Sequence, residues 1–325
     1  MILILSFRQY EQGTDPVIDW LYARKANFIR ISSQDIIGRE NRYDLNVNEG
    51  SLVINGIQIN LDEVKVIWDR RWQDSGLILN NYPENEWPYE QLIFEHDHEI
   101  NYLTNYLHEC FKDKIWLSSP FHEVNKLSML KDAAAAGLNV PASAVINNKQ
   151  DLLAFFHRCH NNIISKPIHH SHYFVSEEYV YSVYTNTFNT YEAIESLPEK
   201  FFPTLFQERI CGEIEIRCFY LDGQFYPMAI LTDQESKEET DIKLSFGLST
   251  TKWVPYQLPR SLEIKLEKLL RTTDNNTGSI DLIKTTSGAY YFIEVNTGGQ
   301  YNAPGFRGNY YLEEKIADWL ITHSC

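Results

Sequence analysis

Two carboxylates and one amide near the end of the chain have the residue types and spacing of a metal site. The segment SIDLI carries Asp281, and the segment FIEVN, predicted to be the return strand of a hairpin, carries Glu294 and Asn296. Side chains alternate along a strand, so Glu294 and Asn296 face the same way and Asp281 can meet them across the pair. A partial carboxylate set of this kind, completed by water and phosphates, suits Mg²⁺. The competing interpretation is a solvated acidic edge, but the apolar neighbours predict that Glu294 is buried, which is costly without a partner.

Two lysines stand in settings that favour anion binding. Lys126 opens a predicted helix, and Lys166 lies in the apolar segment IISKPI. A lysine inside an otherwise apolar strand needs an anion, and a nucleotide phosphate is an obvious one. Taken alone, each residue is equally well explained as a surface lysine whose stem covers apolar neighbours.

A third polar group follows in the segment LFQERICGEIEIRCF. Here an apolar strand runs into Gln207, Glu208 and Ile210, and segments of this kind can bind an adenine through backbone groups while apolar side chains enclose the ring. Glu215 and Arg217 share one face of the strand that comes next. An edge strand with alternating charge would show nearly the same spacing.

These residues need a scaffold, and the first 117 residues predict a parallel α/β lobe. A strand, a helix and a second strand at residues 2–5, 16–24 and 28–31 form the opening of a β-α-β unit. The pattern further predicts a hairpin over 52–59 around Asn55-Gly56, a strand over 64–68 and a helix over 86–110.

The rest of the chain alternates helices with strands. A helix ends at Gly137, and Pro141 prevents it from resuming. The later elements are strands at 163–166, 204–210, 215–220 and 225–231, a hairpin around 179–187, helices at 191–197 and 262–270, a closing hairpin formed by 278–283 and 290–295, and a terminal helix. The fold class is therefore α/β (α+β).

Composition narrows the function classes. A chain of 325 residues predicts two or three lobes, and a net charge of −15 argues against a surface that grips nucleic acid. The N-terminal segment MILILSFRQYEQG lacks a basic start and reads as a buried strand, and no stretch is long and apolar enough to span a membrane. The five cysteines are scattered without a C-x-x-C pair. We therefore expect a cytoplasmic protein without disulfides or a zinc ribbon, and with neither a nucleic-acid nor a membrane partner.

Taken in order, the polar residues resemble the ATP-grasp superfamily over residues 118–300. The matching positions are Lys126, Lys166, Gln207, Glu208, Glu215, Arg217, Asp281, Glu294 and Asn296. More narrowly, the segments VIWDRRW, KPIHHSH and EVNTGGQYNAP are similar to ATP-grasp ligases that mature graspetides, which are microviridin-type peptides cyclised through their side chains. The grasp-with-spasm maturases are the most similar group, and this narrower resemblance covers nearly the whole chain.

The resemblance implies an ATP-grasp fold in three parts: an N-terminal, Rossmann-like pre-ATP-grasp lobe (1–117), a central lobe (118–205) and a C-terminal lobe (206–325). It also implies a role for each matching residue. Lys126 and Lys166 would hold the phosphates of ATP, and Gln207, Glu208 and Ile210 would frame the adenine. Glu215 would bind the ribose, and Arg217, with Lys166, would act in catalysis by steadying the transferred phosphoryl group. The Mg²⁺ ligands would be Asp281, Glu294 and Asn296.

Two positions depart from the family pattern. Many relatives have a glycine-rich loop after the second lysine that covers the phosphates, whereas this chain has His169, His170 and His172 at that place. The loop that covers the phosphates must therefore close in a different way. These histidines lack partner cysteines or carboxylates at zinc-ligand spacing, which favours a solvated loop or a phosphate contact. Thr297 also replaces a proline that is common in relatives.

The implied activity is ATP-dependent macrocyclisation of a ribosomal precursor peptide that carries a leader. An Asp or Glu side chain would become an acyl phosphate, and a Thr or Ser hydroxyl or a Lys amine of the same peptide would attack it. The alternatives are a ligase that adds amino acids to a small molecule or a protein tail, and a non-catalytic nucleotide-binding partner, which the complete metal set disfavours. Relatives suggest a homodimer.

A stretch rich in aromatic residues offers a place for the leader. Tyr179, Tyr181 and Tyr184 alternate within the predicted hairpin, so the segment 169–190 could form a platform for a peptide. Packing of these tyrosines on the helix of their own lobe explains the pattern equally well.

Overall fold

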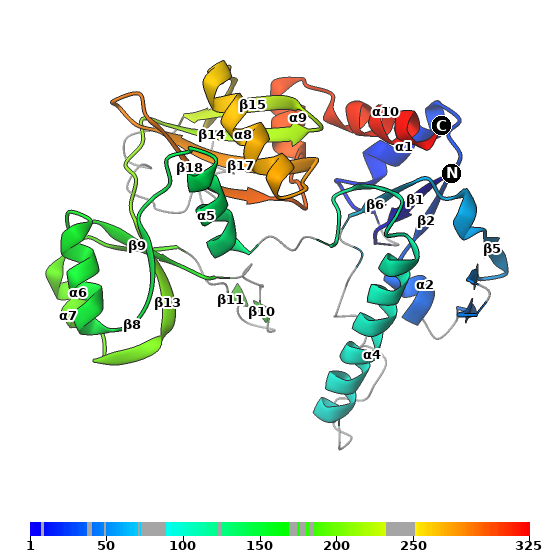
Figure 1. Ribbon diagram of the computed structural model, residues 1–325, viewed down its shortest axis with the longest axis horizontal. Coiled ribbons are helices and arrows are strands. Elements are labelled where there is room, and N and C mark those ends of the chain that lie inside the picture. The colour runs from blue at the N-terminus through cyan, green and yellow to red at the C-terminus, as the bar shows by residue number, and fades with distance from the viewer. Residues whose placement is uncertain are drawn as a thin grey trace.

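The computed structural model describes residues 1–7, 10–37, 41–48, 50–70, 72, 89–121, 125–168, 174–175, 180–181, 185–231 and 251–325. Three sheets of four, four and five strands organise these residues, and two smaller sheets accompany them. Figure 1 shows an elongated molecule in which the N-terminal sheet and the central sheet lie at opposite ends, with the five-stranded sheet between them. Within the described part, no helix has both the length and the apolar composition needed to cross a membrane.

The N-terminal sheet is parallel, as the β-α-β pattern predicts. Its strands are β1 (Ile2–Leu5), β2 (Phe28–Ile31), β6 (Val66–Asp69) and β7 (Ile115–Leu117), in the order β2-β1-β6-β7. The helices α1 (Asp15–Ala23) and α10 (Leu312–Ser324) pack side by side and share an apolar core with this sheet (Figure 1). That core also contains Phe219 and Leu221 from the five-stranded sheet, so the first and last parts of the chain are packed together.

A second apolar core joins this sheet to the remaining N-terminal elements. It combines residues of the three-stranded sheet, formed by β3 (Tyr43–Asn46), β4 (Ser51–Ile54) and β5 (Ile57–Ile59), with residues near the end of the long helix α4 (Tyr89–Cys110). The short helix α2 (Ser33–Ile37) connects β2 to β3, and the 3-10 turn η1 (Leu61–Glu63) connects β5 to β6. In Figure 1 the first half of α4 projects away from the body of the molecule.

A tight turn forms at Asn55-Gly56, where the sequence predicts one. Asn55 and Gly56, between β4 and β5, have φ angles of 51° and 81°. Positive φ at both central residues is the requirement of a hairpin turn that matches the natural twist of its strands, and Asn-Gly and Asp-Gly meet it at low cost. The pair Asp222 and Gly223 does the same in a later hairpin, with φ angles of 40° and 90°.

The central sheet is antiparallel and has a core of its own. Its strands are β8 (Ser143–Asn148), β9 (Ile163–Lys166), β12 (Asn186–Phe188) and β13 (Lys200–Glu208), in the order β12-β9-β13-β8. The helices α6 (Lys149–Arg158) and α7 (Tyr191–Glu195) accompany it, and the described residues of its core all lie in this region, between Ala144 and Phe206. Phe206 belongs to this core, so its neighbours Leu205 and Gln207 on β13 face the other side of the sheet.

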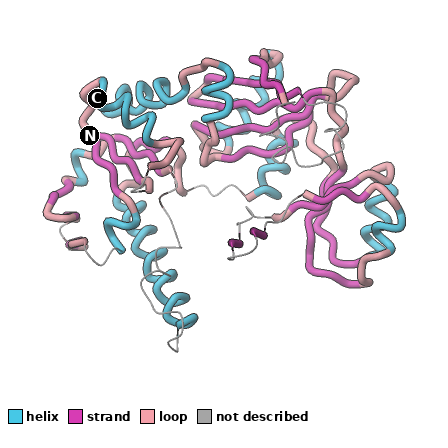
Figure 2. The backbone as a smooth tube through the Cα atoms, turned by 180° about the vertical axis from the view of Figure 1, so that it is seen from behind, coloured by secondary structure: helices cyan, strands magenta, loops and turns pink. Residues whose placement is uncertain are grey.

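The five-stranded sheet is also antiparallel. Its strands are β14 (Ile214–Leu221), β15 (Gln224–Leu231), β16 (Lys252–Pro255), β17 (Thr277–Lys284) and β18 (Tyr290–Asn296), in the order β16-β15-β14-β17-β18. Figure 2 shows this sheet in magenta between the N-terminal sheet and the central sheet. The helices α5 (Lys126–Ala135) and α8 (Arg260–Thr272) cover one face, and α9 (Asn302–Gly308) precedes the terminal helix. Gly137 has a φ of 88° just beyond the end of α5, which agrees with the predicted stop.

One predicted pairing is wrong. The expected hairpin around 179–187 does not form among the described strands, because β11 (Val180–Tyr181) pairs with β10 (Phe174–Val175), while β12 pairs with β9. An alternating pattern identifies a strand and its two faces, but it does not identify the neighbouring strand. His169, His170, His172, Tyr179 and Tyr184 lie outside the described residues, as does the side chain of Tyr181.

Candidate active site

A row of charged residues crosses three neighbouring strands of the five-stranded sheet. Arg217 on β14 lies opposite Asp281 on β17, and Asp281 lies opposite Glu294 on β18. Their sequence neighbours Ile216, Ile280 and Val295 belong to the apolar core under α5 and α8, so the charged row faces the other side of the sheet. The strand register therefore brings together three residues that the sequence singles out.

Asn296 joins this face one step further along. It lies opposite Ser279, and Ser279 precedes Asp281 by two residues on the same strand. Asp281, Glu294 and Asn296 thus share one face of adjacent strands, as the sequence predicts. The described residues contain no group of three or more His, Cys, Asp or Glu side chains placed to hold a metal ion, so this set of two carboxylates and one amide would need water and substrate oxygens to complete a Mg²⁺ site.

Arg217 is buried and fixed in orientation. Its side chain is 7% exposed, its Nε donates a hydrogen bond to Ser279 Oγ at 3.1 Å, and the same nitrogen lies 3.5 Å from Asp281 Oδ1. Ser279 Oγ in turn donates to the carbonyl of Gln300 at 3.3 Å. A cation held in this way presents its charge beside Asp281 at a fixed position, which suits the neutralisation of a transferred phosphoryl group.

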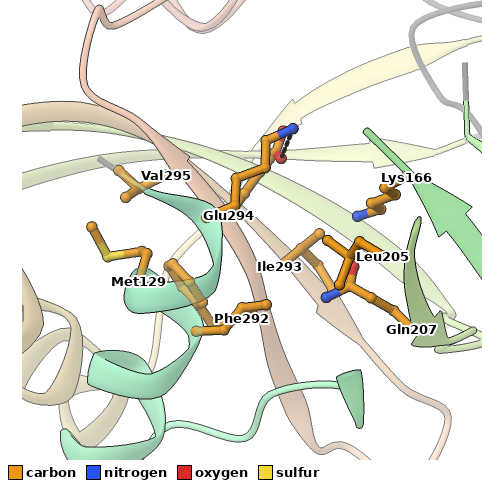
Figure 3. Close-up of a pocket in the computed structure, with 10 residues that line it drawn as sticks. Met129, Lys166, Leu205, Gln207, Phe292, Ile293, Glu294 and Val295 are labelled. Atoms are coloured by element: carbon orange, nitrogen blue, oxygen red, sulfur yellow. Dashed lines mark ion pairs between the residues drawn. The ribbon is translucent and has the colours of Figure 1, made fainter. Parts of the chain in front are cut away.

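An irregularity in the last hairpin adds an apolar residue that the sequence did not reveal. Glu294 lies opposite Asp281 whereas Phe292 lies opposite Leu282, so Ile293 is an extra residue in β18. Bulges of this kind turn a side chain out of the regular alternation and are frequent beside active sites. Ile293 indeed lines the pocket, close to Leu205 and Gln207 of the central sheet (Figure 3).

The pocket lies between the two antiparallel sheets, and it offers about 340 Å³ of space free of protein atoms, which includes space open to solvent. Four of its lining residues are candidates from the sequence: Lys126, Lys166, Gln207 and Glu294. The lining is completed by six apolar residues, none of which carries a functional signal in the sequence: Met129, Leu130, Leu205, Phe292, Ile293 and Val295. Only the spatial approach of the two sheets identifies these walls, since each residue alone looks like an ordinary core residue.

The two lysines stand on different parts of the pocket wall. Lys126 is the first residue of α5, and Asn125 caps this helix by accepting hydrogen bonds from the backbone N–H groups of Leu127 and Ser128. The Nζ of Lys126 donates to the carbonyl of Pro167 at 3.3 Å and lies 4.0 Å from Glu294 Oε2. The dashed line beside Glu294 in Figure 3 marks this ion pair. Lys126 thus links β18 to Pro167, the residue that directly follows the end of β9.

The expectation that Glu294 is buried is wrong in degree. Its side chain is 28% exposed, and it has Lys126 as a partner. The cost of an isolated buried carboxylate therefore does not arise, because the side chain faces the open side of the sheet. The observation that supports Glu294 as a metal ligand is therefore the strand face that it shares with Asp281 and Asn296.

The residues predicted to bind adenine and ribose do not all line the pocket. Gln207 is 2% exposed, and its side-chain amide donates to Ser143 Oγ at 2.9 Å. Glu208 ends β13 with its backbone N–H donating to Ala142, and Glu215 lies two residues before Arg217 on β14. Among the residues that the structure describes, Gln207 lines the pocket, whereas Glu208, Ile210 and Glu215 do not.

No model of a protein family matches the sequence, and no curated protein matches it either. Solved structures do match over the full length. The macrocyclase MdnC from Microcystis aeruginosa MRC, bound with precursor peptide MdnA, has 23% sequence identity and a TM-score of 0.80, with 100% of both chains covered. The chain has the ATP-grasp fold.

Two further structures support this assignment. The RiPP-associated ATP-grasp ligase of Chryseobacterium gregarium, in complex with ADP and a leader and core peptide, has 21% identity and a TM-score of 0.77, over 98% of this chain and 96% of that one. The ATP-grasp ligase PsnB, complexed with minimal precursor, Mg and ADP, has 16% identity and a TM-score of 0.78, over 100% and 97% of the two chains. The fold class predicted from the ATP-grasp resemblance is confirmed.

Proposed function

We propose that this protein is an ATP-dependent peptide macrocyclase. The observation that carries the proposal is the pocket, where Lys126, Lys166 and Gln207 meet Glu294 beside the row of Arg217 and Asp281. Cations, a polar amide and two carboxylates are the groups that a nucleotide, its phosphates and Mg²⁺ require. The ATP-grasp fold, shared over the full length with ligases solved with precursor peptides, favours a peptide as the second substrate.

In this proposal the apolar walls hold the base and the charged groups hold the phosphates. Leu205 and Ile293 approach from the two sheets and would enclose the adenine, with Gln207, Glu208 and Ile210 supplying polar contacts along its edge. Glu215 would bind the ribose. Lys126 and Lys166 would bind the phosphates, and Lys126 would exchange its contact with Glu294 for one with the nucleotide.

Asp281, Glu294 and Asn296 would hold Mg²⁺, which neutralises charge on the β- and γ-phosphates when bound. Arg217 would steady the γ-phosphoryl group as it passes from ATP to an Asp or Glu carboxylate of the peptide, giving ADP and an acyl phosphate. A Thr or Ser hydroxyl or a Lys amine then attacks the acyl carbon and releases inorganic phosphate. Each ring formed removes one water from the peptide, and the protein contributes position and charge without a covalent intermediate of its own.

The proposal further places the enzyme in the cytoplasm as a homodimer with the three lobes 1–117, 118–205 and 206–325, and assigns the leader to the segment 169–190. The alternative acceptors are a small molecule and a protein tail, which would use the same nucleotide site. A test by mass spectrometry separates them.

The purified protein is incubated with ATP, Mg²⁺ and the precursor peptide encoded beside its gene. We expect peptide products lighter by one water per ring, and loss of these products when the leader is removed. The Arg217→Met variant, which lacks the guanidinium beside Asp281, is the matched inactive control. An unchanged precursor mass together with efficient ligation of free amino acids would replace the macrocyclase with a small-molecule ligase.

A further inference from the structure

The loop that follows Asn296 is held from outside its own sheet. The carbonyl of Thr297 accepts a hydrogen bond of 2.7 Å from Ser118 Oγ, in the connector after the N-terminal lobe. The next carbonyl, that of Gly298, accepts a hydrogen bond from Arg70 Nη1. Two consecutive carbonyls directly after a predicted Mg²⁺ ligand are therefore fixed by residues from a distant part of the chain.

Arg70 is itself buried and oriented. It directly follows the last residue of β6, its backbone N–H donates to the carbonyl of Leu5 at 2.8 Å, and it is 4% exposed. Its Nη2 lies 3.9 Å from Glu11 Oε1. Glu11 is equally buried, and its Oε2 accepts hydrogen bonds from Gly13 N at 2.9 Å and Thr14 Oγ1 at 2.8 Å. The guanidinium is thus supported by a carboxylate whose own position is fixed.

Gly13 leaves room for this arrangement. A Cβ at this position would come within 2.5 Å of Arg70 Nη2, so any other residue would displace the guanidinium. The carbonyl of Gly13 accepts a hydrogen bond of 2.8 Å from the hydroxyl of Tyr301, which lies just beyond the same loop. Burial raises the pKa of Tyr301 above its ordinary value, so the hydroxyl keeps its proton and can donate at any physiological pH.

The turn between these contacts is tight. Gly299 has a φ of 50°, and its backbone N–H donates to the carbonyl of Asn296 at 3.1 Å. Displacement of the Gly298 carbonyl would therefore pass directly to Asn296 through a closed turn. An amide is a neutral ligand and attracts a cation less strongly than a carboxylate does, so its contribution depends on correct alignment.

We propose that Arg70 is a positioning residue for Mg²⁺ binding, which acts by holding the loop that aligns Asn296. The proposal rests on the metal set given under Proposed function. Residues behind a metal ligand typically change metal affinity by about 10- to 100-fold when they are removed. A purely structural role for Arg70 would instead lower stability and leave the affinity of the folded protein for Mg²⁺ unchanged.

The test measures Mg²⁺ binding directly, by calorimetric titration of the full-length protein saturated with ADP. Arg70→Met removes the guanidinium and keeps an apolar stem, and Gly13→Ala displaces the guanidinium without altering it. We expect both variants to bind Mg²⁺ at least about tenfold more weakly, while ADP binding in EDTA is unchanged. Arg24→Met is the matched control, since Arg24 also bridges the first and last parts of the chain but pairs with Glu314 and Asp318 of α10.

The outcomes separate this inference from the proposed function. Native Mg²⁺ affinity in Arg70→Met and in Gly13→Ala would overturn the role of Arg70, provided that Asn296→Ala weakens binding. If Asn296→Ala itself binds Mg²⁺ normally, the metal set of the proposed function is wrong. If Arg70→Met does not fold, Gly13→Ala and Ser118→Ala decide, because each weakens the support of the same loop more mildly.

Discussion

Replacement of Glu294 with Gln tests the metal site without altering the shape of the side chain. If Glu294 is a Mg²⁺ ligand, the loss of its negative charge weakens metal binding and removes charge stabilisation in the transition state. That stabilisation amounts to several kcal/mol, and about 1.4 kcal/mol corresponds to a tenfold change in rate. We therefore expect ATP turnover to fall by at least about a hundredfold. Asn296→Ala is expected to do the same from the adjacent position.

The effect on stability is expected to be small. At the observed separation of 4.0 Å, Lys126 and Glu294 attract each other by about 4 kcal/mol at an effective dielectric constant of about 20. Desolvation offsets most of this attraction, and ion pairs that keep contact with solvent contribute a net ~0–1 kcal/mol. For a chain of this length, such a loss lowers the melting temperature by about 2 °C or less. We therefore expect a large fall in ATP turnover and only a small fall in melting temperature.

The assay combines ADP release at saturating Mg²⁺ with thermal unfolding of the same samples. Glu263→Gln is the matched control, because Glu263 pairs with Arg260 at 3.0 Å on the surface helix α8 and has no part in the proposed site. Near-native turnover in Glu294→Gln would refute the metal assignment. A fall in activity accompanied by an equally large loss of folded protein would show that the side chain serves the fold instead.

Two further predictions concern single residues. Lys166→Met should lower kcat/KM for ATP by about 10- to 100-fold, because a hydrogen bond to a charged group contributes about 1.5–3 kcal/mol. Steady-state kinetics that match those of the native enzyme would show that Lys166 does not contact ATP. The exposed Cys211 should react with a thiol reagent in the native protein. Burial raises the pKa of the Cys218 thiol, so Cys218 should react only after denaturation. Labelling of Cys218 under native conditions would contradict the described packing.

Local patterns in the sequence were sufficient for most of the elements. Strands 2–5, 28–31 and 163–166 form with those bounds, because each is a short apolar run followed or preceded by a clear break. The Asn-Gly and Asp-Gly turns form because few other residues accept positive φ at both positions. The shared face of Asp281, Glu294 and Asn296 was predictable for the same reason, since alternation is a local property of strands.

The features that could not be predicted depend on contacts between distant segments. Arg70 and Gly298 are separated by 228 positions, and no local pattern marks their contact. The bulge at Ile293 keeps the apolar pattern of FIEVN intact, so nothing in the sequence separates it from a regular strand residue. The partner of β12 was mistaken because alternation leaves the choice of neighbouring strand open.

The arrangement of the cores explains why the pocket lies where it does. The N-terminal sheet, α10 and part of the five-stranded sheet share one core, whereas the central sheet has a core whose described residues all come from its own region. The pocket lies at the boundary between these two bodies, with Leu205 and Gln207 on one side and Phe292 and Ile293 on the other. Among the described contacts, the hydrogen bond from Lys126 to the carbonyl of Pro167 crosses this boundary at the pocket itself. A nucleotide bound there would touch both bodies at once, so its binding energy would also fix the distance between Lys166, proposed to bind the phosphates, and β18, proposed to bind Mg²⁺. The proposed phosphoryl transfer requires a fixed separation of this kind.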